Sequence, residues 1–303
     1  MTDPSVALLL KNVIKGQVRL DEPMSNHTSF HIGGPADMLV IPECIGDISA
    51  VLRIAHENNI PLTVLGNGSN VLVRDKGIRG IVLKLGNALK NWKREGNIFT
   101  FESGISLAQC CRIIGEAGFT GMEFAVGIPG SLGGAVYMNA GAYDGEMKNA
   151  VRSVQVMTPS GGLKRLSNED LQFSYRHSAL QGSEDIVLEV ALQVSEGNAA
   201  SIQAKMDDFS QRRVSKQPLE YPSAGSTFKR PEGHFVGAMV EQSGLKGFRI
   251  GGAEVSVKHA GFIINAGCAT ASDVLMLMDY VQKKVWEDHG VRLIPEVLIL
   301  GEE

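Results

Sequence analysis

The feature that most constrains this chain is a glycine-dense segment over residues 127–145. Six of its nineteen residues are glycine, and apolar residues such as Ile128 and Leu132 stand among them. So few side chains cannot build a core, whereas apolar positions are untypical of a solvated linker. A glycine-rich backbone can instead approach a phosphate or a ring closely. We interpret the segment as one that wraps a ligand, with Ser131 and Asn139 supplying a hydroxyl and an amide.

A second glycine-containing turn follows a predicted strand over residues 61–65. Its sequence, Gly66-Asn67-Gly68-Ser69-Asn70, resembles the start of a dinucleotide-binding fingerprint. Val71 replaces the third glycine, however, and an extended segment follows where that fingerprint requires a helix. Two interpretations stay open: a backbone nest that holds one anion, and a plain hairpin turn, for which Asn-Gly is a common signal.

Helical and extended patterns alternate along the rest of the chain, and we expect an α+β protein. Apolar spacing predicts helices over residues 47–58, 106–117, 199–215 and 272–289. Ser106 is the expected N-cap of the second helix, and Gly290 the expected stop of the last. Extended patterns predict strands over residues 61–65, 71–73, 80–85, 151–157, 162–166, 186–194 and 293–300, the strands within 151–194 forming a meander.

Composition and charge exclude several classes of protein. The length of 303 residues predicts about two domains. The chain carries 29 Lys and Arg against 33 Asp and Glu, and this small negative charge disfavours the basic surface of a nucleic-acid-binding protein. No apolar run reaches the ~18 residues of a membrane span, and Asp3 stands where a signal peptide needs a basic residue. The four cysteines have no metal-ligand spacing and form no disulfide framework. We expect a cytoplasmic protein with no metal site and no membrane or nucleic-acid partner.

Three polar residues outside the glycine-rich segments are candidates for chemistry. Arg176 can bind a carboxylate or phosphate, but taken alone it is better explained as a surface cation at the start of a strand. Ser226 and Lys229 match the serine–lysine motif of penicillin-recognising enzymes, yet the accompanying Ser-Asp-Asn and Lys-Thr-Gly tripeptides are absent from the sequence. Acyl transfer is therefore disfavoured, and a proton-donating hydroxyl stays open. Glu296 is a lone carboxylate in an apolar segment, either functional if buried or facing water at a strand edge.

In this order the motifs resemble the UDP-N-acetylenolpyruvoylglucosamine reductase family, flavoenzymes of the second committed step of bacterial peptidoglycan synthesis. The resemblance extends over nearly the whole chain. It rests on residues 28–37, 66–70, 127–131, 139–143, 175–176, 224–228 and Glu296.

The resemblance implies a two-lobed vanillyl-alcohol-oxidase (PCMH)-type FAD-binding fold with a smaller α+β substrate-binding domain. Residues 1–84 and 85–212 would form the two FAD-binding lobes, and residues 213–294 the substrate domain. The C-terminal segment 295–303 would return to the first lobe. The short spacing between Arg176 and Ser226 resembles the form of the family that lacks a tyrosine-bearing lid loop.

The resemblance also implies a reaction. NADPH reduces non-covalently bound FAD, and flavin N5 then delivers hydride to C3 of the enolpyruvyl group of UDP-N-acetylglucosamine enolpyruvate, which yields UDP-N-acetylmuramate. Arg176 and Glu296 would stabilise the enolate, and Ser226 would protonate C2. Tyr175, Arg213 and Lys229 would bind the nucleotide diphosphate of the substrate. The implied cofactor-binding residues are Gly66, Asn67, Gly68, Ser69, Asn70, Gly127, Pro129, Gly130, Ser131, Gly133, Gly134, Asn139 and Gly141.

Two other functions compete with this one. An FAD-linked oxidase of the same fold would pass electrons to oxygen, although such enzymes often carry a flavin-linking His or Cys and neither glycine-rich segment contains a His. A nucleotide-binding module without turnover would use Arg176, Ser226 and Glu296 only as structural residues. The expected partner is a small nucleotide-sugar, and the expected state is a monomer.

Overall fold

The computed structural model describes residues 4–86 and 88–303 of the chain. These residues form two compact units, each assembled from segments that are distant in the sequence. Unit 1 consists of Met1–Leu20, Met38–Asn67 and Gly80–Arg213, and unit 2 consists of Asp21–Asp37, Gly68–Arg79 and Val214–Glu303. The three-part division at residues 84 and 212 stays a prediction. Asp3, on which the expectation about a signal peptide depends, lies outside the described residues.

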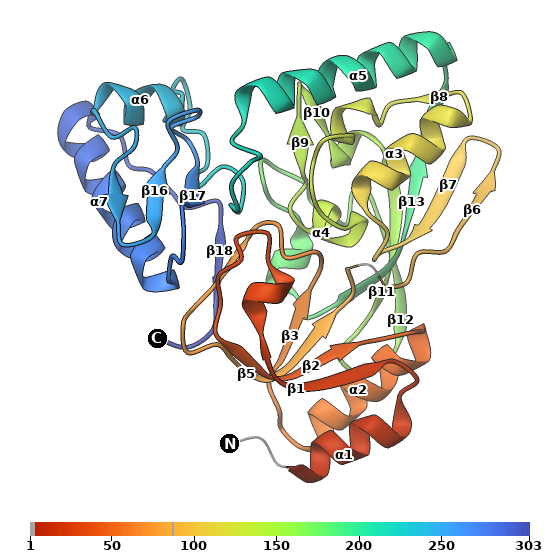
Figure 1. Cartoon of the computed structure of the whole chain (residues 1–303). Coiled ribbons are helices and arrows are strands. Elements are labelled where there is room, and N and C mark those ends of the chain that lie inside the picture. The colour runs from red at the N-terminus through yellow and green to blue at the C-terminus, as the bar shows by residue number, and fades with distance from the viewer. Residues whose placement is uncertain (1–3, 87) are drawn as a thin grey trace. The chain divides into compact units, whose positions relative to one another are not determined.

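A five-stranded antiparallel sheet forms much of unit 1, with strands in the order β12-β11-β13-β7-β6 (Figure 1). In β7 the buried Phe99 and Phe101 alternate with residues that are less buried, and both pack with Val190 of β13 and Ile114 of α3 in one core. The strands are β6 Trp92–Glu95, β7 Ile98–Glu102, β11 Val151–Met157, β12 Leu163–Ser167 and β13 Ile186–Gln193; the helices beside them are α3 Leu107–Glu116 and α4 Leu132–Tyr137.

The sequence predicted the strands β11, β12 and β13, but the predicted meander is wrong. A meander would place β12 between the other two, whereas β11 pairs antiparallel with both β12 and β13. Burial explains this order. β11 carries the buried residues Val154, Val156 and Met157, while β12 is mostly exposed, as befits a strand at the edge of a sheet.

A second core of unit 1 lies between two helices and a four-stranded sheet of order β1-β2-β5-β3. Ile48 and Val51 of α2 pack with Val6 of α1 and with Met38 and Ile81 of the sheet. The elements are α1 Pro4–Val13, β1 Gln17–Pro23, β2 Pro35–Ile41, α2 Ile45–Glu57, β3 Leu62–Leu65 and β5 Ile78–Lys84. Two short antiparallel pairs and a long helix complete this part of the chain. β8 Phe119–Thr120 pairs with the distant β14 Ser195–Glu196, β9 Gly141–Ala142 forms a hairpin with β10 Gly145–Glu146, and the helix is α5 Ala199–Lys216.

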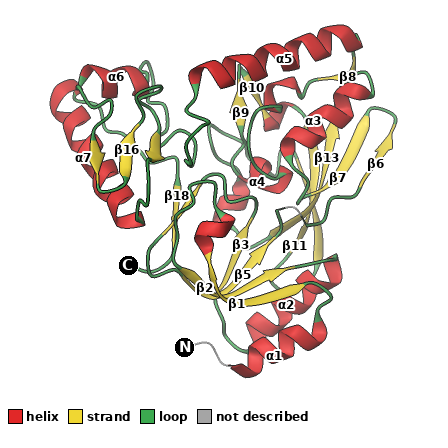
Figure 2. Cartoon of the chain, viewed as in Figure 1, coloured by secondary structure: helices red, strands yellow, loops and turns green. Residues whose placement is uncertain are grey.

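Unit 2 contains a three-stranded antiparallel sheet of order β15-β16-β17, with α6 and α7 beside it (Figure 2). Thr270 and Asp273 form a capping box at the start of α7, and Gly290 ends the helix in a left-handed conformation with φ +66°. Leu277 and Val281 of α7 lie in the core with Val255 of the sheet. The elements are α6 Val236–Gln242, β15 Arg249–Ile250, β16 Ala253–Val255, β17 Ile263–Asn265 and α7 Ala271–His289.

The C-terminal strand of unit 2 is shorter than the sequence predicts. Strand β18 (Leu298–Leu300) pairs in parallel with β4 (Val71–Val73), so the end of the chain lies beside residues 71–73. Residues 293–297, expected in the same strand, lie outside β18, and Pro295 among them forms an isolated bridge with Phe228. Pro295 has no N–H group to donate to a strand ladder, which explains the late start of β18.

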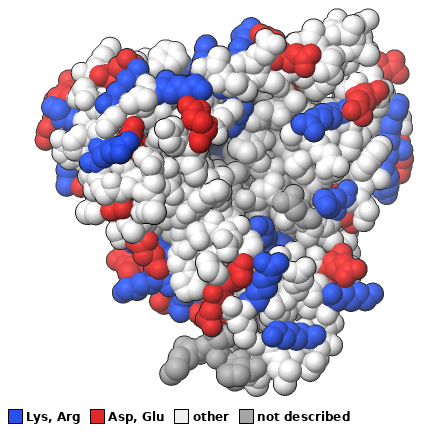
Figure 3. Space-filling model, viewed as in Figure 1, with Lys and Arg blue, Asp and Glu red and all other residues white. Residues whose placement is uncertain are grey.

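The helices predicted from apolar spacing are confirmed, with ends that shift by at most two residues. Ser106 caps α3 as expected, its Oγ accepting a hydrogen bond from the Gln109 N–H over 3.2 Å. Acidic and basic side chains are interspersed on the face drawn in Figure 3, which shows no broad field of one sign among the described residues. No helix in residues 4–86 and 88–303 is long and apolar enough to cross a membrane.

Candidate active site

Gly66 and Ser131 lie against each other in unit 1, which joins the two glycine-containing segments of the sequence. Ser131 is 2% exposed and caps α4, accepting a hydrogen bond from the Gly134 N–H over 3.3 Å. Its Oγ faces Gly66 so closely that a Cβ at position 66 would overlap it. The two segments therefore meet within unit 1 at Gly66 and Ser131, on a surface made largely of backbone.

The glycine-dense segment contains a helix, α4, that its sequence did not predict. Gly133 and Gly134 occupy its first turn, where glycine lowers helix propensity. Packing explains Gly133, because a Cβ at this position would lie 2.9 Å from the Cβ of Ser103. The Ser131 cap offsets part of the propensity cost. Tertiary contact, rather than local preference, therefore determines this helix.

Two side-chain oxygens beside this surface are buried and have no hydrogen-bond partner among the described residues. They are Oδ1 of Asn67 and Oγ of Ser103. Asn67 Oδ1 lies so close to Gly86 that a Cβ there would overlap it. A buried polar atom without a partner costs free energy, and a bound ligand with hydroxyl or N–H groups would remove that cost. Glycine-lined backbone with unsatisfied oxygens fits a dinucleotide cofactor such as FAD.

The residues expected to bind the cofactor divide between the two units. Asn70 of unit 2 donates from Nδ2 to the carbonyl oxygen of Glu296 over 3.1 Å, and its own carbonyl oxygen accepts from the Leu298 N–H over 3.0 Å. The side chain of Asn70 thus holds the C-terminal segment. Unit 1 contains Gly66, Asn67, Gly127, Pro129, Gly130, Ser131, Gly133, Gly134, Asn139 and Gly141, and unit 2 contains Gly68, Ser69 and Asn70.

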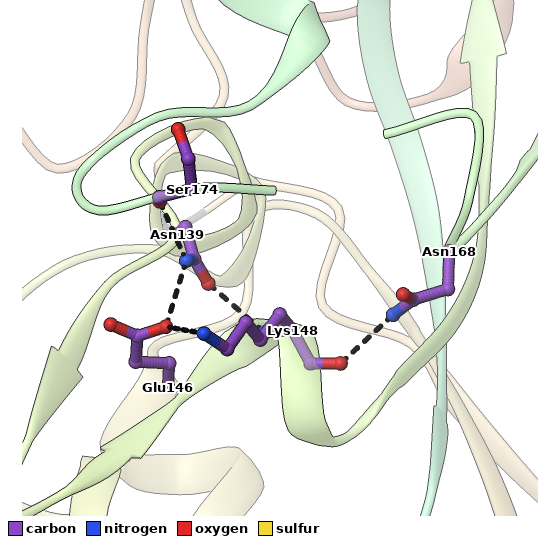
Figure 4. Close-up of polar contacts among 5 residues, drawn as sticks. All are labelled: Asn139, Glu146, Lys148, Asn168 and Ser174. Carbon is purple, nitrogen blue, oxygen red and sulfur yellow. Dashed lines mark hydrogen bonds and ion pairs between the residues drawn. The ribbon is translucent and has the colours of Figure 1, made fainter. Parts of the chain in front are cut away.

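The side chain of Asn139 is committed to the protein rather than open to a ligand (Figure 4). Asn139 is fully buried, and its Nδ2 donates to Glu146 Oε2 over 3.1 Å and to the Ser174 carbonyl over 2.9 Å. Its Oδ1 accepts from the Lys148 N–H over 3.0 Å. Both amide hydrogens are therefore used within the fold, which does not support the expected side-chain contact between Asn139 and a cofactor.

Arg176 occupies the tip of a tight turn in unit 1. Ser174 and His177 exchange backbone hydrogen bonds of 3.1 Å across the turn, and Arg176 has a left-handed φ of +53°. Its Nη2 donates to the Gly141 carbonyl over 3.1 Å, and its guanidinium carbon lies 5.0 Å from the centre of the Tyr175 ring. The guanidinium is thus oriented by the turn, by a carbonyl and by an aromatic ring.

Glu146 of β10 is a charged residue beside Arg176 that no sequence motif identified as a candidate. Its Oε2 accepts from Asn139 and from Lys148 Nζ, the latter over 2.8 Å. Burial raises the pKa of the Glu146 carboxyl, but these hydrogen bonds and the positive charges of Lys148 and Arg176 outweigh it and bring that pKa below its ordinary value. The carboxyl is therefore ionised at neutral pH. Its only signal in the sequence is a single acid directly after the last glycine of the segment.

Arg213, expected to bind the substrate diphosphate, lies half-buried at the end of unit 1. Its side chain packs against Gly127, where a Cβ would lie 2.9 Å from Arg213 Cδ. Burial lowers the pKa of the Arg213 guanidinium, although an arginine stays protonated in any folded protein. Tyr143 stacks on Phe209, with ring centres 4.3 Å apart, in the same region. Glycine at position 127 thus makes room for a cation beside the glycine-dense segment.

Ser226 and Glu296 belong to two segments of unit 2 that are hydrogen-bonded side by side. The Lys229 N–H donates to the Ile294 carbonyl over 2.8 Å, and the Glu296 N–H donates to the Thr227 carbonyl over 2.9 Å. Ser226 is exposed, whereas its neighbour Thr227 is buried. The Oγ1 of Thr227 accepts from the Ile263 N–H over 2.9 Å. The structure therefore brings Glu296 to the loop of Ser226, and it adds Thr227 to the residues that hold this loop.

Other kinds of chemistry find little support in the described part of the chain. No group of three or more His, Cys, Asp or Glu side chains there could hold a metal ion. Burial raises the pKa of the Cys110 thiol and raises that of Cys111 to about 12, so neither provides a thiolate at neutral pH.

Family models match two parts of the chain. Residues 36–167 match an FAD binding domain, and residues 217–300 match the C-terminal domain of UDP-N-acetylenolpyruvoylglucosamine reductase. Two relatives carry the same enzyme name. One from Syntrophomonas wolfei is 50% identical over 287 residues, which cover 95% of this chain and 96% of the relative. One from Geobacillus kaustophilus is 53% identical over 283 residues, which cover 93% of each.

Solved structures agree with these matches. UDP-N-acetylenolpyruvylglucosamine reductase from Thermus caldophilus superposes with a TM-score of 0.80 at 33% identity, over 95% of this chain and 100% of that one. Alkyldihydroxyacetonephosphate synthase has a TM-score of 0.51 at 17% identity over 65% of this chain and 41% of that one, a likeness of fold alone. The expected fold class, α+β with a vanillyl-alcohol-oxidase-type FAD-binding fold, is confirmed.

Proposed function

Since this chain belongs to the UDP-N-acetylenolpyruvoylglucosamine reductase family, we propose that it reduces UDP-N-acetylglucosamine enolpyruvate to UDP-N-acetylmuramate. NADPH is the proposed hydride donor and FAD the non-covalent cofactor, and the step belongs to peptidoglycan precursor synthesis. The observation that carries this proposal is about 50% identity, over nearly the full length, to relatives that bear the name of this enzyme.

The backbone surface around Gly66 and Ser131 is the part of unit 1 that we propose holds FAD. Its glycines allow close approach, and Asn67 Oδ1 and Ser103 Oγ are buried oxygens that cofactor hydroxyl or N–H groups would satisfy. When bound, FAD supplies the hydride-transfer chemistry, and the protein supplies placement and electrostatics.

Arg176 is the proposed electrostatic stabiliser. Reduction of the enolpyruvyl group at C3 leaves negative charge that spreads onto the substrate carboxylate. A guanidinium already oriented by Gly141 and Tyr175 can meet that charge without reorganising, which is the condition for strong stabilisation of a transition state. We expect Arg176 to be needed for reduction of the nucleotide rather than for oxidation of NADPH.

Ser226 is the proposed donor of the proton to C2 of the substrate. A serine hydroxyl is a weak acid, so it needs neighbours that favour proton release or a relay from water. Glu296 is the residue proposed to stabilise the enolate together with Arg176, and its backbone N–H donates a hydrogen bond to the residue that follows Ser226. Tyr175, Arg213 and Lys229 are the proposed contacts to the nucleotide diphosphate, with the two cations providing the charge complement.

The test of this function begins with the visible spectrum of the purified protein. We expect a yellow protein with flavin absorption, and NADPH oxidation that depends on the enolpyruvyl nucleotide. A colourless protein, or a flavin whose reoxidation is indifferent to that nucleotide, would contradict the proposal. Fast reoxidation by oxygen alone would instead favour an FAD-linked oxidase of the same fold.

A further inference from the structure

We propose that Glu146 is a positioning residue for Arg176, holding the guanidinium in the orientation in which it meets the anionic substrate. This inference rests on the proposed function, because it assumes that Arg176 stabilises negative charge on the substrate. Glu146 itself lies in the β9–β10 hairpin and touches the protein groups around Arg176.

The backbone brings Glu146 and Arg176 to the same residue. In the pairing of β9 with β10, Glu146 stands opposite Gly141. The carbonyl oxygen of Gly141 accepts the hydrogen bond from Arg176 Nη2, over 3.1 Å. A Cβ on Gly141 would lie 2.8 Å from Glu146 Cγ and 2.5 Å from the Gly145 carbonyl, so glycine is required for the carboxylate to pack here. Any shift of Glu146 therefore moves the acceptor that holds Arg176.

A second connection runs through Asn139, as Figure 4 shows. The Nδ2 of Asn139 donates to Glu146 Oε2 over 3.1 Å and to the carbonyl oxygen of Ser174 over 2.9 Å. Ser174 opens the tight turn that carries Arg176 in its left-handed conformation. Glu146 thus fixes both the carbonyl to which the guanidinium binds and the turn from which it projects.

The charge of Glu146 adds a third connection. The Glu146 side chain is only 22% exposed, and its Oε2 forms an ion pair with Lys148 Nζ over 2.8 Å. A half-buried charge is costly, and a neutral side chain would pair the same hairpin backbone at lower cost. The positive charge of Arg176 is among the influences that keep the Glu146 pKa low, and the same attraction acts on the guanidinium in return. The carboxylate therefore restrains Arg176 electrostatically as well as sterically.

The experiment compares Glu146→Gln with Glu146→Asp. Gln keeps the size of the side chain and an oxygen for Asn139 and Lys148, but it removes the charge. We expect Glu146→Gln to lower kcat for the enolpyruvyl nucleotide about tenfold, the size typical of coupling inside one hydrogen-bonded network. FAD content and the rate of flavin reduction by NADPH stay within about twofold of the native protein. Glu146→Asp should recover most of the lost kcat.

Two variants of the same region serve as controls. Lys148→Met removes the cation that pairs with Glu146 Oε2 and should leave kcat nearly unchanged. Asn168→Ala removes the hydrogen bonds from Asn168 Nδ2 to the carbonyl oxygens of Lys148 and Val151, so it loosens the segment without touching Glu146 or Arg176. It should lower the unfolding midpoint and leave kcat close to native. If Asn168→Ala lowered kcat as much as Glu146→Gln, a merely structural role would explain both, and the inference would be wrong.

Combination with Arg176→Lys tests whether Glu146 acts through Arg176. Glu146→Gln should lower kcat little further in the Arg176→Lys protein, because the guanidinium that Glu146 positions is already absent. A full additional tenfold loss, or an unchanged kcat in Glu146→Gln alone, would overturn the inference.

A readout without turnover separates this inference from the proposed function. In protein labelled with ¹⁵N-arginine, the side-chain signal that disappears in Arg176→Lys belongs to Arg176. We expect that signal to be sharp in the native protein and broadened in Glu146→Gln. An unchanged signal would overturn the inference whatever the enzyme reduces. Failure of all variants, and of the native protein, to reduce the nucleotide would instead contradict the proposed function.

Discussion

The backbone N–H of Glu296 donates a 2.9 Å hydrogen bond to the carbonyl oxygen of Thr227, the residue that follows Ser226. The bond fixes a residue near the C-terminus to the loop that carries the proposed proton donor. The neighbouring bridge between Phe228 and Pro295 extends the same contact. The placement of Ser226 therefore depends on the last segment of the chain, and the proposed roles of the two residues are physically linked.

Ser226→Ala removes the proposed proton donor and little else, because the side chain is exposed. We expect flavin reduction by NADPH to stay native while formation of UDP-N-acetylmuramate falls by roughly a hundredfold or more, a typical contribution of a general acid. Stopped-flow absorbance follows the first half-reaction, and chromatography of the product follows the second. Equal slowing of both half-reactions would show that Ser226 is not the donor.

Thr227→Val tests the support beneath Ser226. The substitution removes the hydroxyl that accepts the Ile263 N–H and leaves that buried donor without a partner. We expect the free energy of unfolding to fall by about 2 kcal/mol and product formation to slow, since the loop of Ser226 loses its anchor. Urea unfolding and product assays measure the two effects. Thr227→Ser keeps the oxygen and should restore much of both; equal damage from Val and Ser would speak against the hydrogen bond as the cause.

Gly66→Ala tests the proposed cofactor surface. The new methyl group would overlap Ser131 Oγ, so the two glycine-containing segments must separate. We expect a lower ratio of bound flavin to protein, measured by absorbance after release of the cofactor. Gly182→Ala is the matched control, because a Cβ there meets no atom within 4 Å. Adding Ser131→Ala to Gly66→Ala removes the overlapping oxygen and should regain flavin; no recovery would mean that the clash is not the reason for the loss.

Asp47→Asn tests a buried carboxylate that has no proposed part in the chemistry. Asp47 is 3% exposed and accepts hydrogen bonds from the N–H groups of Lys15, Gly16 and Glu43 over 2.8–3.0 Å. Burial raises the pKa of this carboxyl, but the backbone hydrogen bonds outweigh burial and bring the pKa below its ordinary value. The folded state therefore binds the proton less readily than the unfolded state does.

The sign of the pH effect follows from that difference in pKa. The stabilisation by ionised Asp47 is complete above the pKa of the unfolded state and is lost as the pH falls through the folded pKa. Asp47→Asn should lower the free energy of unfolding by about 2 kcal/mol at pH 7, and the gap to the native protein should narrow below about pH 4. Urea unfolding of both proteins at several pH values measures this difference in the free energy of unfolding. Asp279→Asn, on an exposed helix face, should have little effect; a pH-independent gap for Asp47→Asn would contradict the argument.

Local patterns predicted much of the secondary structure. Apolar spacing and end signals located the long helices, including the Gly290 stop of α7, because these preferences act within a few residues. The glycine positions likewise identified Gly66 and the segment around Ser131 as parts of a ligand-binding surface, although the contact between them is not encoded locally. The order of the motifs was sufficient to indicate the family, since motif order is a property of the chain itself.

Tertiary structure decided which of these segments meet. Burial placed β11 between β12 and β13 in its sheet, packing against Ser103 produced α4, and Pro295 delayed the start of β18. The relation of Glu146 to Arg176 through Gly141 has no local signal, because it depends on strand register and on a turn some thirty residues later. Such contacts reflect the burial of whole faces against one another, whereas a sequence pattern carries only what each segment prefers by itself.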